Sequence, residues 1–162
     1  MNNILIFTDG SARGNPGPGG WGAIVVCDGK VHELGGRDVH TTNNKMELTG
    51  AIKALEFVSA RNISAPIVIF SDSEYVIKGM TEWLVNWQRK NWRTAARKPV
   101  LNQELWQTLA ALAKDFKIEW QYVAGHSGHE ANERCDVIAT SFADDLPVPL
   151  YSGDMKKYSI KI

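Results

Sequence analysis

The stretch FTDGSARGNPGPGGWGAIVV, residues 7–26, places one acid, Asp9, in front of a run of glycines and prolines. Within it, residues 17–22 match the G-x-G-x-x-G pattern of dinucleotide-binding loops, whose glycines open a helix that holds a pyrophosphate. Here the next residues are β-branched and lead to Asp28-Gly29 and a second extended run, which predicts a hairpin. No Gly-Lys-Ser/Thr follows, so a P-loop is disfavoured as well. The glycines are therefore expected to form a rigid turn between strands, and attention moves to Asp9.

Length and composition are those of one globular domain. The chain has 162 residues, 44% hydrophobic and 22% charged. No apolar run approaches the ~20 residues that a transmembrane helix needs, and the N-terminus lacks the features of a signal peptide. Cys27 and Cys135 lie far apart with no C-x-x-C, which favours free thiols over a disulfide or a zinc site. We expect a cytoplasmic protein with no membrane partner.

The net charge of zero conceals a segregation of charge. Residues 83–103 contain no acid and five bases, so the remaining residues carry 18 acids against 13 bases. A basic segment of this kind indicates a partner with dense negative charge.

Hydrophobic periodicity predicts an α/β fold with the element order β-β-β-α-β-α-α-β-α. Helices are expected over residues 44–60, 74–88 with a break near Gly79, 102–114 and 131–142, and strands over residues 4–9, 20–37 as a hairpin, 66–70 and 117–123. These elements predict a mixed five-stranded sheet with helices on both faces. Residues 1–143 are expected to form the domain, and 144–162 a tail of unknown role in which residues 158–160 add a strand or stay mobile.

Four acids fall at element ends or on inward-facing helix positions: Asp9, Glu47, Asp72 and Asp136. Asp9 and Asp72 end strands, where an open sheet leaves a crevice for ligands, and they would meet if those strands were neighbours. Clustered carboxylates repel one another, and a hard cation such as Mg²⁺ is the simplest neutraliser. The pattern therefore indicates a divalent-metal site.

Each acid also has an ordinary structural explanation. Glu47 could complete a capping box with Asn44, and Asp72 could cap the helix that follows it. Asp9 beside Gly10 could be a turn aspartate, and Asp136 a solvated helix residue.

The acids and the order of elements resemble ribonuclease H, most closely the bacterial type 1 enzymes. The resemblance covers residues 4–142 and rests on six ordered motifs: FTDGS (7–11), GNPG (14–17), TNNKME (42–47), SDS (71–73), GHSGH (125–129) and NERCD (132–136). It implies endonucleolytic hydrolysis of the RNA strand of RNA–DNA hybrids, without sequence specificity, leaving 5′-phosphate and 3′-hydroxyl ends.

The resemblance also implies the roles of the site residues. The four acids would hold two Mg²⁺ ions, with Mn²⁺ as a possible substitute, in a two-metal mechanism. His126 would be a loop histidine that assists proton transfer or product departure, although a lone histidine in a loop is often without a role. The enzyme would act on the hybrid as a monomer.

Substrate contacts follow from the same resemblance. Asn15, Asn43 and Asn44, with the backbone around Gly10 and Ser11, would contact the minor groove and its 2′-hydroxyls. Thr42 with Asn43 would bind a DNA-strand phosphate. The basic handle, about residues 83–101, resembles the protrusion of the bacterial enzymes, and its expected contacts are Trp83, Arg89, Lys90, Trp92, Arg93, Arg97 and Lys98. A solvated basic helix with Trp83 and Trp87 packed inward is the alternative, and we expect both descriptions to hold, with Trp92 facing the DNA.

Two positions depart from the family pattern. Glu74 stands where the bacterial enzymes often have a glutamine that contacts the hybrid, and it adds negative charge near Asp72. His40 stands where an arginine can assist the phosphate contact.

Two other functions share part of this evidence. A catalytically idle hybrid-binding module would need only the basic handle, but it gains nothing from clustered acids near a phosphate. Another nuclease or a transposase-like enzyme of the same fold would share the acids, whereas the Thr-Asn-Asn motif and the handle favour hybrid cleavage.

Overall fold

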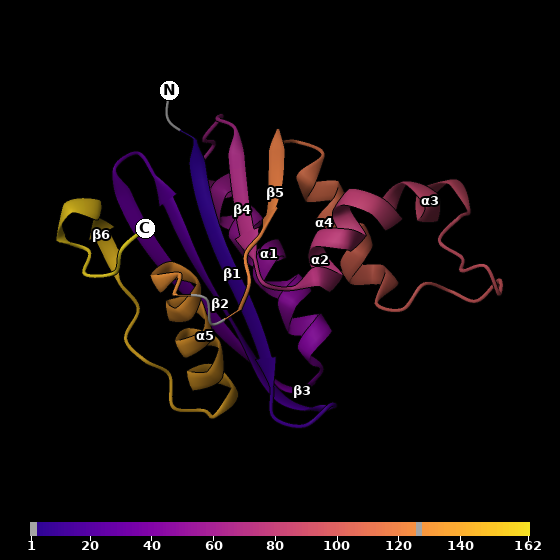
Figure 1. Ribbon diagram of the computed structural model, residues 1–162, viewed down its shortest axis with the longest axis horizontal. Coiled ribbons are helices and arrows are strands. Elements are labelled where there is room, and N and C mark those ends of the chain that lie inside the picture. The colour runs from indigo at the N-terminus through magenta and orange to yellow at the C-terminus, as the bar shows by residue number, and fades with distance from the viewer. Residues whose placement is uncertain (1–2, 126–127) are drawn as a thin grey trace.

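A mixed sheet with strand order β5-β4-β1-β2-β3-β6 forms the centre of the computed structural model, which describes residues 3–125 and 128–162 (Figure 1). Strands β1, β4 and β5 are parallel, and the β1-β2-β3 meander is antiparallel. The strands are β1 (Ile4–Ala12), β2 (Gly17–Cys27), β3 (Lys30–Thr41), β4 (Ile67–Ser71), β5 (Ile118–Tyr122) and β6 (Ser152–Asp154). In the described part of the chain, no helix combines the length and apolarity needed to cross a bilayer.

Helices cover both faces of the sheet, as predicted (Figure 1). They are α1 (Asn43–Ala60), α2 (Glu74–Lys78), α3 (Leu84–Arg89), α4 (Gln103–Ala113) and α5 (Glu130–Ala143). Because side chains alternate along a strand, Ile4 and Ile6 of β1 face the core shared with α1 and α4, whereas Phe7 faces α5. Every predicted helix and strand of residues 4–142 is present, with ends shifted by a few residues.

The sixth strand comes from the tail, so the predicted count of five strands is one too few. Residues 152–154 pair antiparallel with residues 30–32 of β3, and residues 158–160 form no strand. A Ser-Gly-Asp segment has no apolar alternation, and its pairing depends on residues far away in the sequence. The pattern of the tail alone therefore does not predict it.

Four glycines of the quoted stretch, residues 17, 19, 20 and 22, lie inside strand β2 rather than in a turn. The turn is residues 13–16, closed by the Arg13 N–H donating to the Pro18 carbonyl at 2.7 Å. Gly20 and Gly22 of β2 face the backbone of α5, and Gly35 of β3 faces its Ile138 and Phe142 side chains. A Cβ atom at Gly22 would lie 2.6 Å from the Cys135 carbonyl oxygen. The glycines therefore allow α5 to approach the sheet closely.

The predicted break near Gly79 is confirmed. Residues Gly79–Trp83 form a π-helical turn between α2 and α3. Gly79 lies against the fully buried Trp106, so that an added Cβ would overlap its indole ring. Beyond this turn, α3 and the following loop project from the body of the molecule at the right of Figure 1.

We expect Gly22→Ala to destabilise the protein by about 1–3 kcal/mol, because the added methyl group overpacks the contact with α5. Urea unfolding followed by circular dichroism measures the change. Gly50→Ala in α1 is the matched control: its Cβ would meet atoms no closer than 3.3 Å, and the gain in helix propensity of about 1 kcal/mol offsets the tighter contact. Equal stability of the two variants would contradict the close approach of α5.

Candidate active site

Asp9 and Asp72 are brought together by the pairing of two parallel strands. Strands β1 and β4 pair with Phe7 opposite Phe70, and the two rings stack with centroids 4.8 Å apart. Asp9 and Asp72 follow these residues by two positions, and side chains two apart on a strand point to the same face. Both acids therefore lie beyond the stacked rings. Asp72 directly follows β4, but Asp9 lies inside β1, which continues through pairing with β2 to Ala12 instead of ending at Asp9 as predicted.

Glu47 reaches this pair because Gly10 has no side chain. A Cβ atom at Gly10 would overlap the backbone nitrogen of Glu47 and lie 2.9 Å from its Cα. The Gly10 N–H also donates to Asp9 Oδ1 at 2.8 Å. Carboxylate oxygens of Asp9, Glu47 and Asp72 all lie within 4.8 Å of one another. Helix α1 thus adds a third acid to the two from the sheet.

The capping roles considered for Glu47 and Asp72 are taken by other residues. The Thr42 hydroxyl accepts from the Lys45 N–H at 3.2 Å and caps α1. The Ser73 hydroxyl accepts from the Val76 N–H at 3.2 Å and caps α2. Glu47 Oε1 is buried and has no hydrogen-bond partner among the residues that the structure describes. These acids are therefore available to a ligand.

The pKa values show the cost of gathering the acids. Burial, followed by the negative charge of Asp72, raises the pKa of Asp9 to about 7. Burial and the charge of Asp9 raise the pKa of Glu47 well above its usual range, and burial raises that of Asp72. A divalent cation would reduce the repulsion between the carboxylates and would be coordinated by Oε1 of Glu47. The residues present fit such an ion.

Asp136 lies on α5 near this group but outside the close cluster of three. Its negative charge adds a small contribution to the raised pKa of Asp9 and of Asp72, which places it near both acids. The predicted His126 lies outside the described residues.

Asn132 is a site residue that the sequence reasoning did not assign. Its side chain is buried, and its hydrogen bond to Asp72 partly offsets the effect of burial on the pKa of that acid. Within residues 3–125 and 128–162, Asn132 Oδ1 is buried and finds no hydrogen-bond partner. In the sequence, Asn132 could have been identified from its position four residues before Asp136, which places both residues on the same face of the helix.

The predicted minor-groove residues surround the start of α1. Asn43 Oδ1 accepts from the Ala12 N–H at 2.6 Å and so ties the end of β1 to α1. Thr42 caps the same helix, while Asn15 and Asn44 are exposed. Two of the four polar side chains therefore already have structural partners. Gly10 and Ser11 lie beside them in β1.

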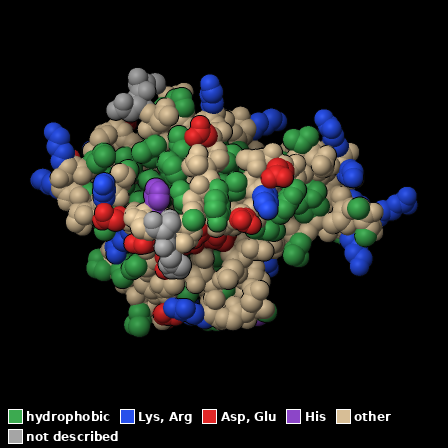
Figure 2. Space-filling view, viewed as in Figure 1, with side chains coloured by type: hydrophobic (Ala, Val, Ile, Leu, Met, Phe, Trp, Pro, Cys, Tyr) green, Lys and Arg blue, Asp and Glu red, His purple; other side chains and the backbone are tan. Residues whose placement is uncertain are grey.

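The basic handle is a protrusion built on aromatic rings that pack against one another at tilted angles. Trp83, Trp87 and Trp92 follow one another with centroids 5.8 and 6.0 Å apart, and Trp87 lies 5.1 Å from Trp106. Trp92 was expected to face the DNA; it packs on Trp87 and is half-buried, which leaves part of its ring available. Figure 2 shows Lys and Arg gathered on this protrusion and acids near the middle of the same face. Its exposed cations are Arg89, Lys90, Arg93, Arg97 and Lys98.

The two departures from the family pattern are exposed. Glu74 lies 3.7 Å from Lys78 in an ion pair, which offsets part of its negative charge. His40 lies near the end of β3, and its backbone N–H donates to Asp38.

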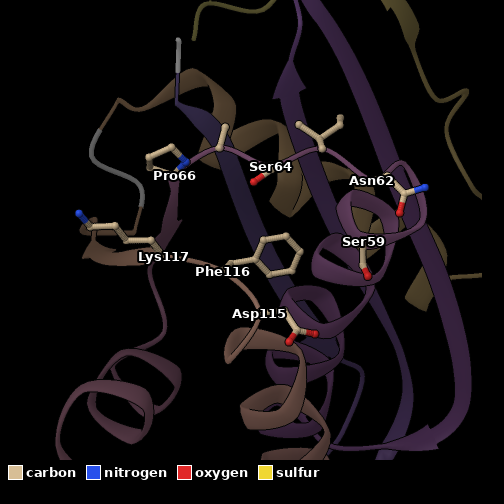
Figure 3. Close-up of a pocket in the computed structure, with 9 residues that line it drawn as sticks. Ser59, Asn62, Ser64, Pro66, Asp115, Phe116 and Lys117 are labelled. Atoms are coloured by element: carbon tan, nitrogen blue, oxygen red, sulfur yellow. The ribbon is translucent and has the colours of Figure 1, made fainter.

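A separate pocket of about 470 Å³ lies at the amino ends of β4 and β5, away from the acids (Figure 3). Pro66 precedes β4 and Lys117 precedes β5, whereas Asp72 follows β4. This pocket therefore has no part in the acidic site.

The sequence matches the family described as RNase H over residues 1–144. The chain belongs to the ribonuclease H family. A ribonuclease H of Cyanothece sp. is 58% identical over 139 residues, which cover 85% of this chain and 87% of the relative. A ribonuclease HI of Pseudomonas syringae pv. tomato is 48% identical over 145 residues, or 90% and 95% of the two chains.

Solved ribonucleases H1 share the fold. LC9-RNase H1 matches with a TM-score of 0.83 and 25% identity, covering all of this chain and 83% of its own. LC11-RNase H1, solved in complex with an RNA/DNA hybrid, matches with a TM-score of 0.68 and 25% identity over 88% of this chain and 98% of its own.

In the metal-free protein, thermal stability should fall as the pH rises from about 4 through about 7. Asp9 ionises freely when unfolded but holds its proton to about pH 7 when folded, so stability present at low pH is lost as that proton leaves. Scanning calorimetry in EDTA from pH 4.5 to 8.5 measures the slope. Asp9→Asn should flatten it and raise Tm at pH 8, by about 2–4 °C for each kcal/mol relieved. An identical slope in the two proteins would contradict this.

Proposed function

We propose that this chain is an endonuclease that hydrolyses the RNA strand of RNA–DNA hybrids with two divalent ions, normally Mg²⁺ and alternatively Mn²⁺, leaving 5′-phosphate and 3′-hydroxyl ends. The observation that carries the proposal is the group of three carboxylates within 4.8 Å, from Asp9 inside β1, Glu47 of α1 and Asp72 after β4. Family membership supports the same reaction. The proposed substrate is the one bound in the LC11-RNase H1 complex.

Each residue of the site has a proposed task. Asp9, Glu47, Asp72 and Asp136 would hold the ions, which supply Lewis acidity for water activation and for the departing 3′ oxygen. The Gly10 N–H fixes one oxygen of Asp9, and Asn132 orients Asp72 by a hydrogen bond. His126 would take or deliver a proton during product departure.

Recognition of the hybrid would combine the minor-groove side chains with the handle. Asn15, Asn43 and Asn44, beside Gly10 and Ser11, would contact 2′-hydroxyls, and Thr42 a DNA phosphate. A hollow of about 730 Å³ lies between the start of α1 and the start of α4, and its lining includes Lys45 but also the acids Asp38 and Glu104. The handle, and not this hollow, would therefore supply the positive charge for the DNA strand. Because such contacts go to the backbone, no base sequence would be selected.

The proposed working state is a monomer in the cytoplasm. All residues of the proposed site come from one chain. Cys27 and Cys135 are buried free thiols, which fits a reducing compartment.

Purified protein should cut only the RNA strand of a labelled RNA–DNA hybrid, and only with Mg²⁺ or Mn²⁺. RNA–RNA and DNA–DNA duplexes should stay intact, and EDTA should stop the reaction. Asp9→Asn should lower kcat by at least about 10³-fold without unfolding, since one cluster ligand is lost. Tight binding of an uncut hybrid by the wild type would establish the idle binding module instead.

Removing one handle cation should weaken hybrid binding and reduce its salt dependence. Each lost phosphate contact should lower the slope of log K against log [salt] by about 1. Fluorescence anisotropy in EDTA, where the hybrid is not cleaved, measures Arg89→Ala and Lys98→Ala over a salt series. Lys53→Ala on α1, which removes an exposed cation paired with Glu56 at 3.5 Å, should leave the slope unchanged.

A further inference from the structure

Glu33 of β3 is a buried carboxylate outside the active site. Its side chain is 1% exposed and accepts two hydrogen bonds from Arg134 of α5, from Nε at 2.8 Å and from Nη2 at 3.0 Å. Burial alone would raise the pKa of Glu33, but the bonds from Arg134 and the tail outweigh it and hold that pKa below its usual range. A charged pair thus joins the sheet to α5.

The tail completes the partners of this pair. The Tyr158 hydroxyl donates to Glu33 Oε2 at 2.6 Å, and the Tyr151 N–H donates to Oε1 at 2.8 Å. Arg134 Nη2 also donates to the Pro149 carbonyl at 3.0 Å. We name Glu33, Arg134, Tyr158 and the Pro149 and Tyr151 backbone the C-terminal clamp.

Apolar contacts hold the tail on the same side of the sheet. The rings of Tyr151 and Tyr158 lie 5.0 Å apart. Together with Ile162 they pack against the core cluster that includes Phe7 of β1 and Cys135 of α5. In Figure 1 the tail runs from the end of α5 to β6 and returns towards the start of α5.

The C-terminal clamp contacts α5 through Arg134, on the side of the helix opposite Asn132 and Asp136. Successive helix residues are 100° apart, so Arg134 lies about 200° around the helix from both Asn132 and Asp136. Those two residues share the face towards Asp9 and Asp72. Any rotation of α5 about its axis would therefore move both of them.

At Gly20, Gly22 and Gly35 the sheet beneath α5 offers no side chains of its own, so the side chains that interlock packed elements come only from the helix at these positions. Ile138 and Phe142 of α5 lie over Gly22 and Gly35. A buried ion pair is in general a poor source of stability compared with apolar packing. Because the Glu33–Arg134 pair lies where α5 packs on the glycines of β2 and β3, we assign it a role in setting the orientation of α5.

We propose that the C-terminal clamp positions the active site by fixing the rotation of α5, so that Asn132 and Asp136 meet Asp9 and Asp72. Glu33, Arg134 and Tyr158 are thus positioning residues that contact no substrate. The effect on catalysis rests on the proposed function, whereas the effect on the geometry of Asn132 does not.

Tyr158→Phe tests the clamp by removing one hydroxyl, and Tyr151→Phe is the matched control because its hydroxyl donates only within the tail, to the Asp154 carbonyl at 2.6 Å. We expect Tyr158→Phe to raise the Mg²⁺ concentration for half-maximal cleavage about 3- to 10-fold. KM for the hybrid should stay within about twofold, and the control should match the wild type.

A metal-free readout separates the clamp from the proposed function. The NMR resonances of the Asn132 side-chain amide in EDTA should shift or broaden in Tyr158→Phe and stay in place in Tyr151→Phe. An unmoved Asn132 amide, or a lower Tm with unchanged Mg²⁺ dependence, would overturn the positioning role. A wild-type protein that cleaves no hybrid would overturn the proposed function alone.

Discussion

Mutual repulsion of carboxylates held within 4.8 Å is the constraint around which this molecule is arranged. Folding places Asp9, Glu47 and Asp72 where none can ionise at its ordinary pKa. Rigid surroundings hold the three carboxylates together against this repulsion. They are the parallel pairing of β1 with β4, the stacked rings of Phe7 and Phe70, and the close approach of α1 at Gly10. The three carboxylates cannot move apart to lower their repulsion. The site is therefore preorganised to bind positive charge.

Much of the fold could be predicted because its signals are local. The apolar spacing of residues 44–60 and the uninterrupted run of residues 66–70 determine a helix and a buried strand without knowledge of their partners. Asp9 and Asp72 were recognisable because each closes an apolar, strand-like run of the sequence, although β1 itself continues to Ala12. Glu47 was harder to assign, since its spacing from Asn44 also suits a capping box. The structure excludes that role because the hydroxyl of Thr42 caps the helix instead.

What could not be predicted depends on contacts between distant residues. Gly17 and Gly19 suggested a turn because their backbone freedom is a local property, whereas their pairing in β2 and the close approach of α5 to Gly20 and Gly22 depend on distant residues. Asn132 became recognisable as a site residue only when Asp72 was beside it. The tail has no periodicity, and its course is set by Glu33, more than 100 residues earlier in the chain.

The short strand β6 also affects how the molecule meets its neighbours. A free sheet edge offers unpaired N–H and C=O groups to any passing chain, which is a route to aggregation. Here β6 covers the first residues of β3, and the uncovered part of β3 carries the charged residues Arg37 and Asp38. At this edge the chain supplies its own last strand, and the charges beyond it disfavour addition of a strand from another molecule.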